Sequence, residues 1–243
     1  MPSFRKLVLA LFLLSAGMAS AQVPNYQFRM LHWDDFMGGL LTTGNIGSLG
    51  WSFTSTGTGS GITYLAGACD ANRCGILRDT AGTTNPSRMI LRLSPGGVGT
   101  VGVLRGDQSF KFVWMIKLGA SGASTLARLG ITSDATAAQA ASGIWFEKLG
   151  ADNNWFGVTR SASSQTRTAA LAATGTAWVR LSVWRKDAST ISFQVNDDAV
   201  VDLAATIPTG ELQPFALIDN NASTTGQSMY IDSFIIGVIN ITR

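Results

Sequence analysis

The segment ISFQVNDDAVVDLAATIPTG (191–210) places three aspartates, Asp197, Asp198 and Asp202, close together in a chain that has few acids. Such a cluster could bind a metal ion, supply half of a catalytic carboxylate pair, or form the turn of a hairpin. Asn and Asp tolerate left-handed backbone dihedrals and hydrogen-bond their own backbone, as a tight turn requires. The segment lacks the spaced Asp, Asn and Gly ligands of a calcium loop. The sequence therefore favours the turn and predicts no cofactor and no metal site, with calcium as the alternative.

Catalytic carboxylates are scarce elsewhere. A glycoside hydrolase usually needs two carboxyl groups about 5 to 10 Å apart. The two glutamates, Glu147 and Glu211, lie in separate segments, and neither has an acid two residues away. No Gly-x-Ser-x-Gly motif is followed by an acid and a histidine, so a serine hydrolase is not indicated either. The chain is predicted not to be an enzyme; the alternative is a glycan-active hydrolase or lyase with an unusual site, such as Glu147 with Asp152.

Binding is the chemistry that the remaining side chains favour, because the chain has seven tryptophans. An indole face stacks on a sugar ring while Asn and Asp hold its hydroxyls. Trp184 shares a strand face with polar residues and is predicted to point outward. Trp155 is predicted at a loop edge beside Asn153 and Asn154. These four residues are the candidate ligand-binding residues; the alternative is that the two tryptophans cover the second sheet or a subunit contact.

The elements that must position these residues show a period-2 alternation of apolar and polar side chains, which is typical of β-strands. Turn signals rich in Gly, Ser, Asn and Asp separate the strands, and many short strands of this kind predict a sandwich or a barrel. The segment 133–142 (SDATAAQAAS) fits a turn or two of helix and a loop equally well. The predicted strands cover 87–94, 109–119, 125–133, 142–150, 154–161, 177–187, 191–195, 213–220 and 229–239.

The first 21 residues read as a signal peptide, with Arg5 and Lys6 before an apolar run and a small-residue cleavage site ending at Ala21. Residues 22–243 are then predicted to form one domain. Without Arg5 and Lys6, the 18 basic residues become 16 against 15 acids, a balance that does not favour a nucleic-acid partner. No later segment is apolar for long enough to span a membrane. The predicted localisation is secreted, periplasmic or cell-surface, with a phage particle as the alternative.

Cys69 and Cys74 are the only cysteines. In an oxidising compartment their close spacing predicts a disulfide that pins a loop. Together with the single histidine, His32, they cannot form a four-ligand zinc site without carboxylates. We interpret His32, beside Trp33 and Asp34, as a structural residue at the start of the domain.

The order of the segments carries a family resemblance. The matching segments are WDDFMGG (33–39), GWSF (50–53), FVWMIKL, RLGI, GIWFEK, NWFGVTR, AWVRLSVW, ISFQVNDDAVVDL, IPT (207–209) and MYIDSFII. This order resembles the concanavalin A-like, laminin-G-like jelly-roll modules of bacterial surface proteins and phage virion proteins. The resemblance implies an all-β fold, an antiparallel two-sheet jelly-roll sandwich, in which NDD is a hairpin turn. It also favours a non-enzymatic structural or adhesive module whose partner is a glycan, another cell-surface ligand or copies of itself. A self-assembling fibre or a virion or shell subunit is the alternative.

Overall fold

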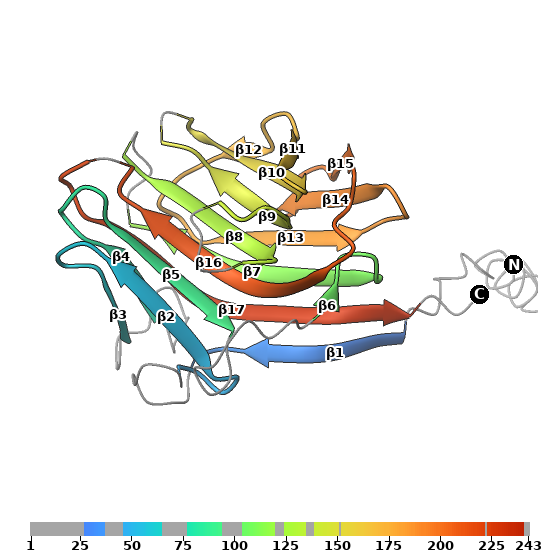
Figure 1. The fold of residues 1–243 in the computed structure, drawn as a ribbon, viewed down its shortest axis with the longest axis horizontal. Coiled ribbons are helices and arrows are strands. Elements are labelled where there is room, and N and C mark those ends of the chain that lie inside the picture. The colour runs from blue at the N-terminus through green and yellow to red at the C-terminus, as the bar shows by residue number, and fades with distance from the viewer. Residues whose placement is uncertain are drawn as a thin grey trace, which may run out of the picture.

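Two antiparallel sheets pack face to face in the computed structural model of the chain (Figure 1). The structure describes residues 27–36, 46–64, 77–93, 104–119, 124–134, 139–150, 152–221 and 223–240. In Figure 1 the nine-stranded sheet lies in front of the eight-stranded sheet, and the strands of the two sheets cross at an angle. This is the antiparallel two-sheet sandwich that the sequence predicted.

The eight-stranded sheet is centred on two long strands, β7 and β17, that pair with each other. Its order is β15-β14-β13-β7-β17-β4-β3, and β1 pairs with the second part of β17 beside β4. The strands are β1 (Gln27–Asp34), β3 (Gly61–Tyr64), β4 (Leu77–Ala81), β7 (Phe110–Leu118), β13 (Val179–Arg185), β14 (Thr190–Val195), β15 (Val201–Ala204) and β17 (Gln227–Asn240).

The nine-stranded sheet has the order β11-β10-β9-β8-β16-β5-β2. Two short strands pair with the first residues of strands inside this order, β12 with β10 and β6 with β16. The strands are β2 (Trp51–Thr56), β5 (Arg88–Leu93), β6 (Leu104–Arg105), β8 (Leu126–Thr132), β9 (Gly143–Lys148), β10 (Asn154–Ser161), β11 (Ser164–Arg167), β12 (Ala172–Ala173) and β16 (Glu211–Asp219).

Alternation in the sequence accounts for most of these strands. Along β7 every second side chain, from Phe110 to Leu118, is buried, while the residues between them are half-buried. The same pattern predicted β5, β8, β9, β10, β13, β14, β16 and β17, and the structure confirms each of them. It did not predict β6, β11 and β12, which are two to four residues long and too short to show a period. It also gave no bounds for β1, β2, β3, β4 and β15. The described residues contain no helix, so none of them forms a helix that could span a membrane.

The core lies between the sheets and is rich in aromatic side chains. Trp51 of β2 packs edge-on against Trp114 of β7 and Phe234 of β17, with ring centroids 5.6 and 5.3 Å away. Edge-to-face pairs of this kind are favoured by the quadrupoles of the rings. These three rings join the two sheets, since Trp51 belongs to one sheet and its partners to the other.

The aspartate-rich segment forms a hairpin turn between β14 and β15, as predicted. Asn196 has a left-handed φ of 51°, and the Asp198 amide donates to the Val195 carbonyl over 3.0 Å. Asp197 pairs with Arg180, whereas Asp202 lies beyond the turn, on β15. The carboxylates of Asp197 and Asp202 therefore have separate partners, and the three aspartates serve the turn and its flanking strand.

One acidic side chain lies in the core. Asp79 of β4 is 0% exposed, and no described residue hydrogen-bonds either of its carboxyl oxygens. It is paired across the sheet with Ile62 and Met229, which bring no charge. Burial raises the pKa of the Asp79 carboxyl well above its ordinary value, since the low-polarity core disfavours the charged form.

This carboxyl is expected to make the free energy of unfolding depend on pH. Its folded pKa is raised, so its contribution is fully present below the unfolded pKa of about 3.9 and is lost as the pH rises through the folded pKa. Asp79→Asn, which cannot ionise, is expected to be more stable than the wild type near neutral pH. Within that window the wild type should lose about 1.4 kcal/mol per pH unit relative to the variant. Urea unfolding across the acid-to-neutral range measures this, and parallel pH curves for the two proteins would contradict it.

Some predictions fall on residues outside the described part of the chain. These are the signal peptide over residues 1–21 and the disulfide between Cys69 and Cys74. Both stay predictions.

Candidate functional site

The outer face of the nine-stranded sheet holds the acids proposed as an alternative catalytic pair. Glu147 of β9 is 1% exposed, and its Oε2 accepts a hydrogen bond from Arg128 Nε of β8 over 2.7 Å. The other oxygen, Oε1, lies 3.8 Å from Arg167 Nε of β11, and Arg167 Nη2 donates to Asp152 Oδ2 over 2.9 Å. We call these four residues the Glu147 network. Arg167 therefore bridges the two candidate carboxylates.

The Glu147 network has the geometry of a structural ion-pair cluster. A glycosidase that uses two carboxyl groups needs one that donates a proton to the leaving group and a second that attacks the sugar or activates water. Here each carboxylate faces a guanidinium group instead. The Arg167 guanidinium carbon also lies 3.4 Å from the centroid of the Phe156 ring, a cation–π contact that fixes it in place. Cross-strand register produces the arrangement, because Arg128 pairs with Glu147 and Glu147 with Phe156.

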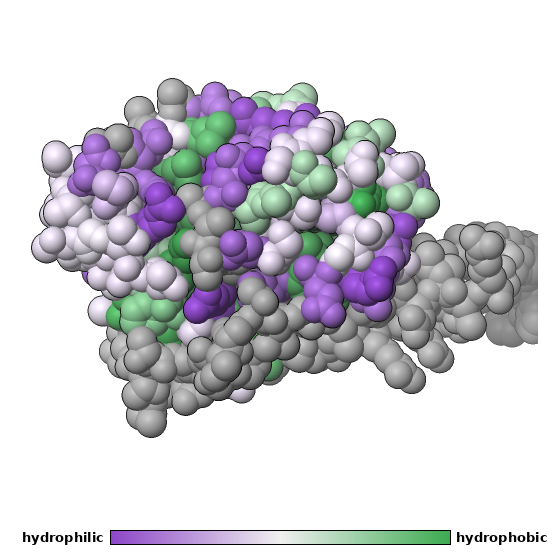
Figure 2. All heavy atoms as spheres, in the orientation of Figure 1, coloured by the Kyte–Doolittle hydropathy of each residue, from purple (hydrophilic) through white to green (hydrophobic). Residues whose placement is uncertain are grey.

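Beside this network the same face carries an aromatic pair that is closed to ligands. Trp145 and Phe215 meet edge-on with ring centroids 6.3 Å apart, and Trp145 is 1% exposed. Its ring lies over Gly143, where an added Cβ would be 2.8 Å from a ring carbon. Figure 2 shows hydrophilic and hydrophobic residues side by side on the surface that faces the viewer. Because the Trp145 ring is covered, it offers no open stacking surface in this conformation.

Trp155 was predicted to be exposed at a loop edge, and this was wrong. It is 1% exposed and belongs to the core between the sheets. The reason is that β10 begins at Asn154, which puts Trp155 on the inward side of the strand. Strand β12 then pairs with this end of β10, placing Ala172 opposite Trp155. A polar sequence neighbourhood had suggested a loop where a strand already runs.

The two predicted asparagines lie near the Glu147 network. Asn153 is exposed, and its carbonyl accepts a hydrogen bond from the Thr174 amide over 2.8 Å. Asn154 is half-buried at the start of β10, next along that strand face from Phe156. Trp184, in contrast, belongs to β13 of the other sheet. The four predicted ligand residues are therefore not brought together into one site.

Trp184 lies on the outer face of the eight-stranded sheet, as its alternation predicted. It is half-buried, while its strand neighbour Val183 is in the core. Lys111 of β7 is its cross-strand partner, with Nζ 5.3 Å from the ring centroid. The lysine holds the ring by a cation–π contact on a surface that still reaches solvent.

A second aromatic and lysine pair occurs farther along the same face. Tyr230 of β17 is paired with Lys117 of β7, whose Nζ lies 5.6 Å from the ring centroid. Met115 lies between the two lysines on the outward side of β7 and is half-buried. We call the surface formed by Lys111, Met115, Lys117, Trp184 and Tyr230 the Trp184 face.

Hydrogen-bonding groups adjoin the Trp184 ring. Ser192 of β14 is its cross-strand partner on the other side, and the Ser192 hydroxyl donates to Asp202 Oδ1 over 2.6 Å. Lys186 Nζ also donates to the Asp202 carboxylate. The hydrogen bond from Lys186, followed by that from Ser192, lowers the pKa of Asp202 below its ordinary value. Asp202 therefore places a fixed negative charge one strand beyond Ser192.

Sequence reasoning identified Trp184 on this face but missed the residues around it. The outward positions of Lys111 and Lys117 follow from the alternation along β7. That Tyr230 stands beside Lys117 depends on the register of β17, which the sequence does not reveal. The Trp184 ring and the two lysines could together contact the apolar face and the hydroxyls of a sugar, whereas Ser192 is 0% exposed and only anchors Asp202.

Solved structures share this fold at low sequence identity. A protein of unknown function, SO2946 from Shewanella oneidensis MR-1, is 15% identical with a TM-score of 0.57, over 79% of this chain and 80% of that one. The Emp47p carbohydrate recognition domain is 10% identical with a TM-score of 0.58, over 87% of this chain and 96% of that one. A beta-1,3-glucanase from Mycobacterium marinum is 13% identical with a TM-score of 0.55, over 86% of this chain and 98% of that one.

These likenesses confirm the concanavalin A-like jelly roll and show the fold alone, because one fold serves both recognition and catalysis. No curated protein matches the chain in sequence. The family comparison covers residues 72–232, from shortly before β4 into β17. Over these residues the chain matches the model described as SO2946-like, C-terminal domain, and it belongs to that family.

Proposed function

We propose that this chain is a non-enzymatic glycan-binding module that acts outside the cytoplasm and binds its ligand on the Trp184 face. The observation that carries the proposal is Trp184 itself, a half-buried indole held by Lys111 on an outer sheet face, with the solvent-exposed Lys186 and Asp202 on the same side of the sheet. An aromatic ring flanked by donors and acceptors is the arrangement that a sugar ring and its hydroxyls require.

Three further points support the proposal. The carboxylates nearest to a catalytic arrangement, Glu147 and Asp152, share Arg167 in an ion-pair network. One of the solved structures with this fold is a carbohydrate recognition domain, which makes sugar recognition compatible with the architecture. The signal-peptide pattern of residues 1–21 is the reason for placing the module outside the cytoplasm.

Removal of the indole tests the ligand face. In a glycan array, Trp184→Ala of the full chain is expected to bind at least about 10-fold more weakly than the wild type, a loss of about 1.4 kcal/mol. The matched control is Phe156→Ala, which removes a half-buried aromatic side chain from the opposite face and should keep wild-type affinity.

Three outcomes would contradict the proposal: no glycan bound by the wild type, equal affinity for Trp184→Ala, or loss of affinity in the control alone. Light scattering on the same samples detects self-association. A stable oligomer of the wild type that Trp184→Ala dissociates, with no glycan bound, would favour the assembly role instead.

A further inference from the structure

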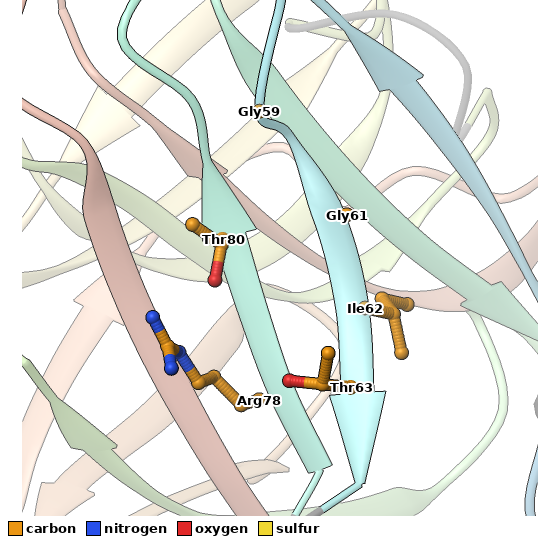
Figure 3. A pocket seen from close by; sticks show the side chains of 6 residues that line it. All are labelled: Gly59, Gly61, Ile62, Thr63, Arg78 and Thr80. Carbon is orange, nitrogen blue, oxygen red and sulfur yellow. The ribbon is translucent and has the colours of Figure 1, made fainter.

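A pocket lies at the β3–β4 edge of the sheet that carries the Trp184 face. Its volume is about 240 Å³, and it is lined by Gly59, Gly61, Ile62, Thr63, Arg78 and Thr80. Figure 3 shows the hydroxyls of Thr63 and Thr80 and the guanidinium of Arg78 on one side of the two strands, while Ile62 points to the other. The polar groups of two neighbouring strands therefore meet above the same stretch of sheet.

Arg78 of β4 differs from the other arginines because its guanidinium has no hydrogen-bond or ion-pair partner among the described residues. Every other arginine whose side chain the structure describes pairs with a carboxylate, a hydroxyl or a backbone carbonyl. Among the same residues no hydrogen-bond or ion-pair partner faces Arg78, and its Nε is nevertheless buried. A partly desolvated guanidinium without a counter-charge is unfavourable, so an anionic ligand would supply what the protein does not.

The pocket is continuous with the Trp184 face. Tyr230 is paired with Lys117 on one side and with Arg78 on the other, and Arg78 is paired with Thr63. Lys117 lies six positions along β7 from Lys111, the partner of Trp184, which is a span of about 20 Å. A chain of several sugars is long enough to reach from the indole to the guanidinium.

We infer that this pocket binds the anionic substituent, a carboxylate or a sulfate, of an acidic glycan whose sugar rings lie on the Trp184 face. The planar guanidinium of Arg78 can donate two parallel hydrogen bonds to such a group. The Thr63 and Thr80 hydroxyls could donate further hydrogen bonds to the same anionic group. The inference rests on the proposed function and deepens it by naming the ligand class.

The experiment compares matched acidic and neutral polysaccharides, using the full chain. Surface plasmon resonance is measured on polygalacturonate and its methyl ester, and on dextran sulfate and dextran. The wild type is expected to bind the acidic member of at least one pair about 10-fold more tightly, and Arg78→Met should remove that preference. Arg105→Met, which removes an exposed arginine from the other sheet, is the control and should keep it.

A second variant keeps the charge and fills the pocket. Nothing lies within 4 Å of the position where a Cβ on Gly61 would be, so Gly61→Val should fold normally. It is expected to lose the acidic preference as Arg78→Met does. The pair that discriminates identifies the substituent as a carboxylate or a sulfate.

Equal binding of acidic and neutral members by the wild type, or a preference that survives in Arg78→Met, would overturn the inference. The proposed function would stand in that case if glycan is still bound through Trp184. If neither the array nor these polysaccharides bind at all, the proposed function fails and the inference fails with it.

Discussion

Asp34→Ala is expected to lower the free energy of unfolding by about 3 to 5 kcal/mol, because three donors, two of them in buried hydrogen bonds, lose their shared acceptor. Asp34 ends β1 and is 1% exposed. Its Oδ1 accepts from the Phe36 amide over 2.8 Å, and its Oδ2 accepts from the Leu49 amide over 3.1 Å and from Trp51 Nε1 over 3.0 Å. One carboxylate thus joins β1 to the start of β2, and through Trp51 to the aromatic core.

Backbone geometry shows how closely the chain wraps this carboxylate. Gly47 has φ of 66°, a left-handed conformation, and a Cβ there would be 2.4 Å from Asp34 Oδ2. The turn before β2 is therefore shaped around the side chain. Urea unfolding measures the loss, and Asp198→Ala, which removes an exposed carboxylate, should change stability by no more than about 0.5 kcal/mol. A loss below about 1 kcal/mol for Asp34→Ala would show that the donors find other partners.

The second large effect concerns the Glu147 network. Glu147→Gln is expected to destabilise the fold by about 3 to 5 kcal/mol, because it removes the carboxylate that forms an ion pair with the buried Arg128 guanidinium. Replacement of both partners, Arg128→Met with Glu147→Leu, should recover most of that loss, since neither charge is then buried. Glycan affinity of the double variant should equal that of the wild type.

This prediction separates a structural role for Glu147 from a catalytic one. A hydrolase would lose activity in Glu147→Gln while keeping most of its stability, and the double variant would be inactive. Urea unfolding and an assay for released reducing sugar, run on the same samples, distinguish the two cases. Sugar release by the wild type that Glu147→Gln abolishes would overturn the non-enzymatic proposal.

The strands could be predicted from the sequence because alternation is a local property. Along β7 and β13 the polarity of each side chain indicates whether it points into the core or outward, and for that reason the outward position of Trp184 was predictable. The hairpin turn after β14 was predictable for a similar reason, since Asn196 carries a left-handed dihedral that suits few residue types.

Cross-strand contacts were not predictable in the same way, because they depend on register between segments far apart in the chain. The pairing of Arg78 with both Tyr230 and Thr63 joins strands β4, β17 and β3. No pattern of residues within a single strand predicts this pairing. Trp155 shows the complementary error. Its polar neighbours suggested exposure, but its burial depends on the side of β10 that it occupies and on the pairing of β12 with this end of β10.

The most direct test of the account is hydroxyl-radical footprinting of the full chain with and without a glycan selected on the array. Radicals oxidise accessible Trp, Tyr and Met side chains, so we expect the ligand to protect Trp184, Tyr230 and Met115, all of them half-buried on one face. The glycan should be recovered intact. Protection of Phe156 on the opposite sheet with no change at Trp184, or recovery of shortened glycan, would contradict the account.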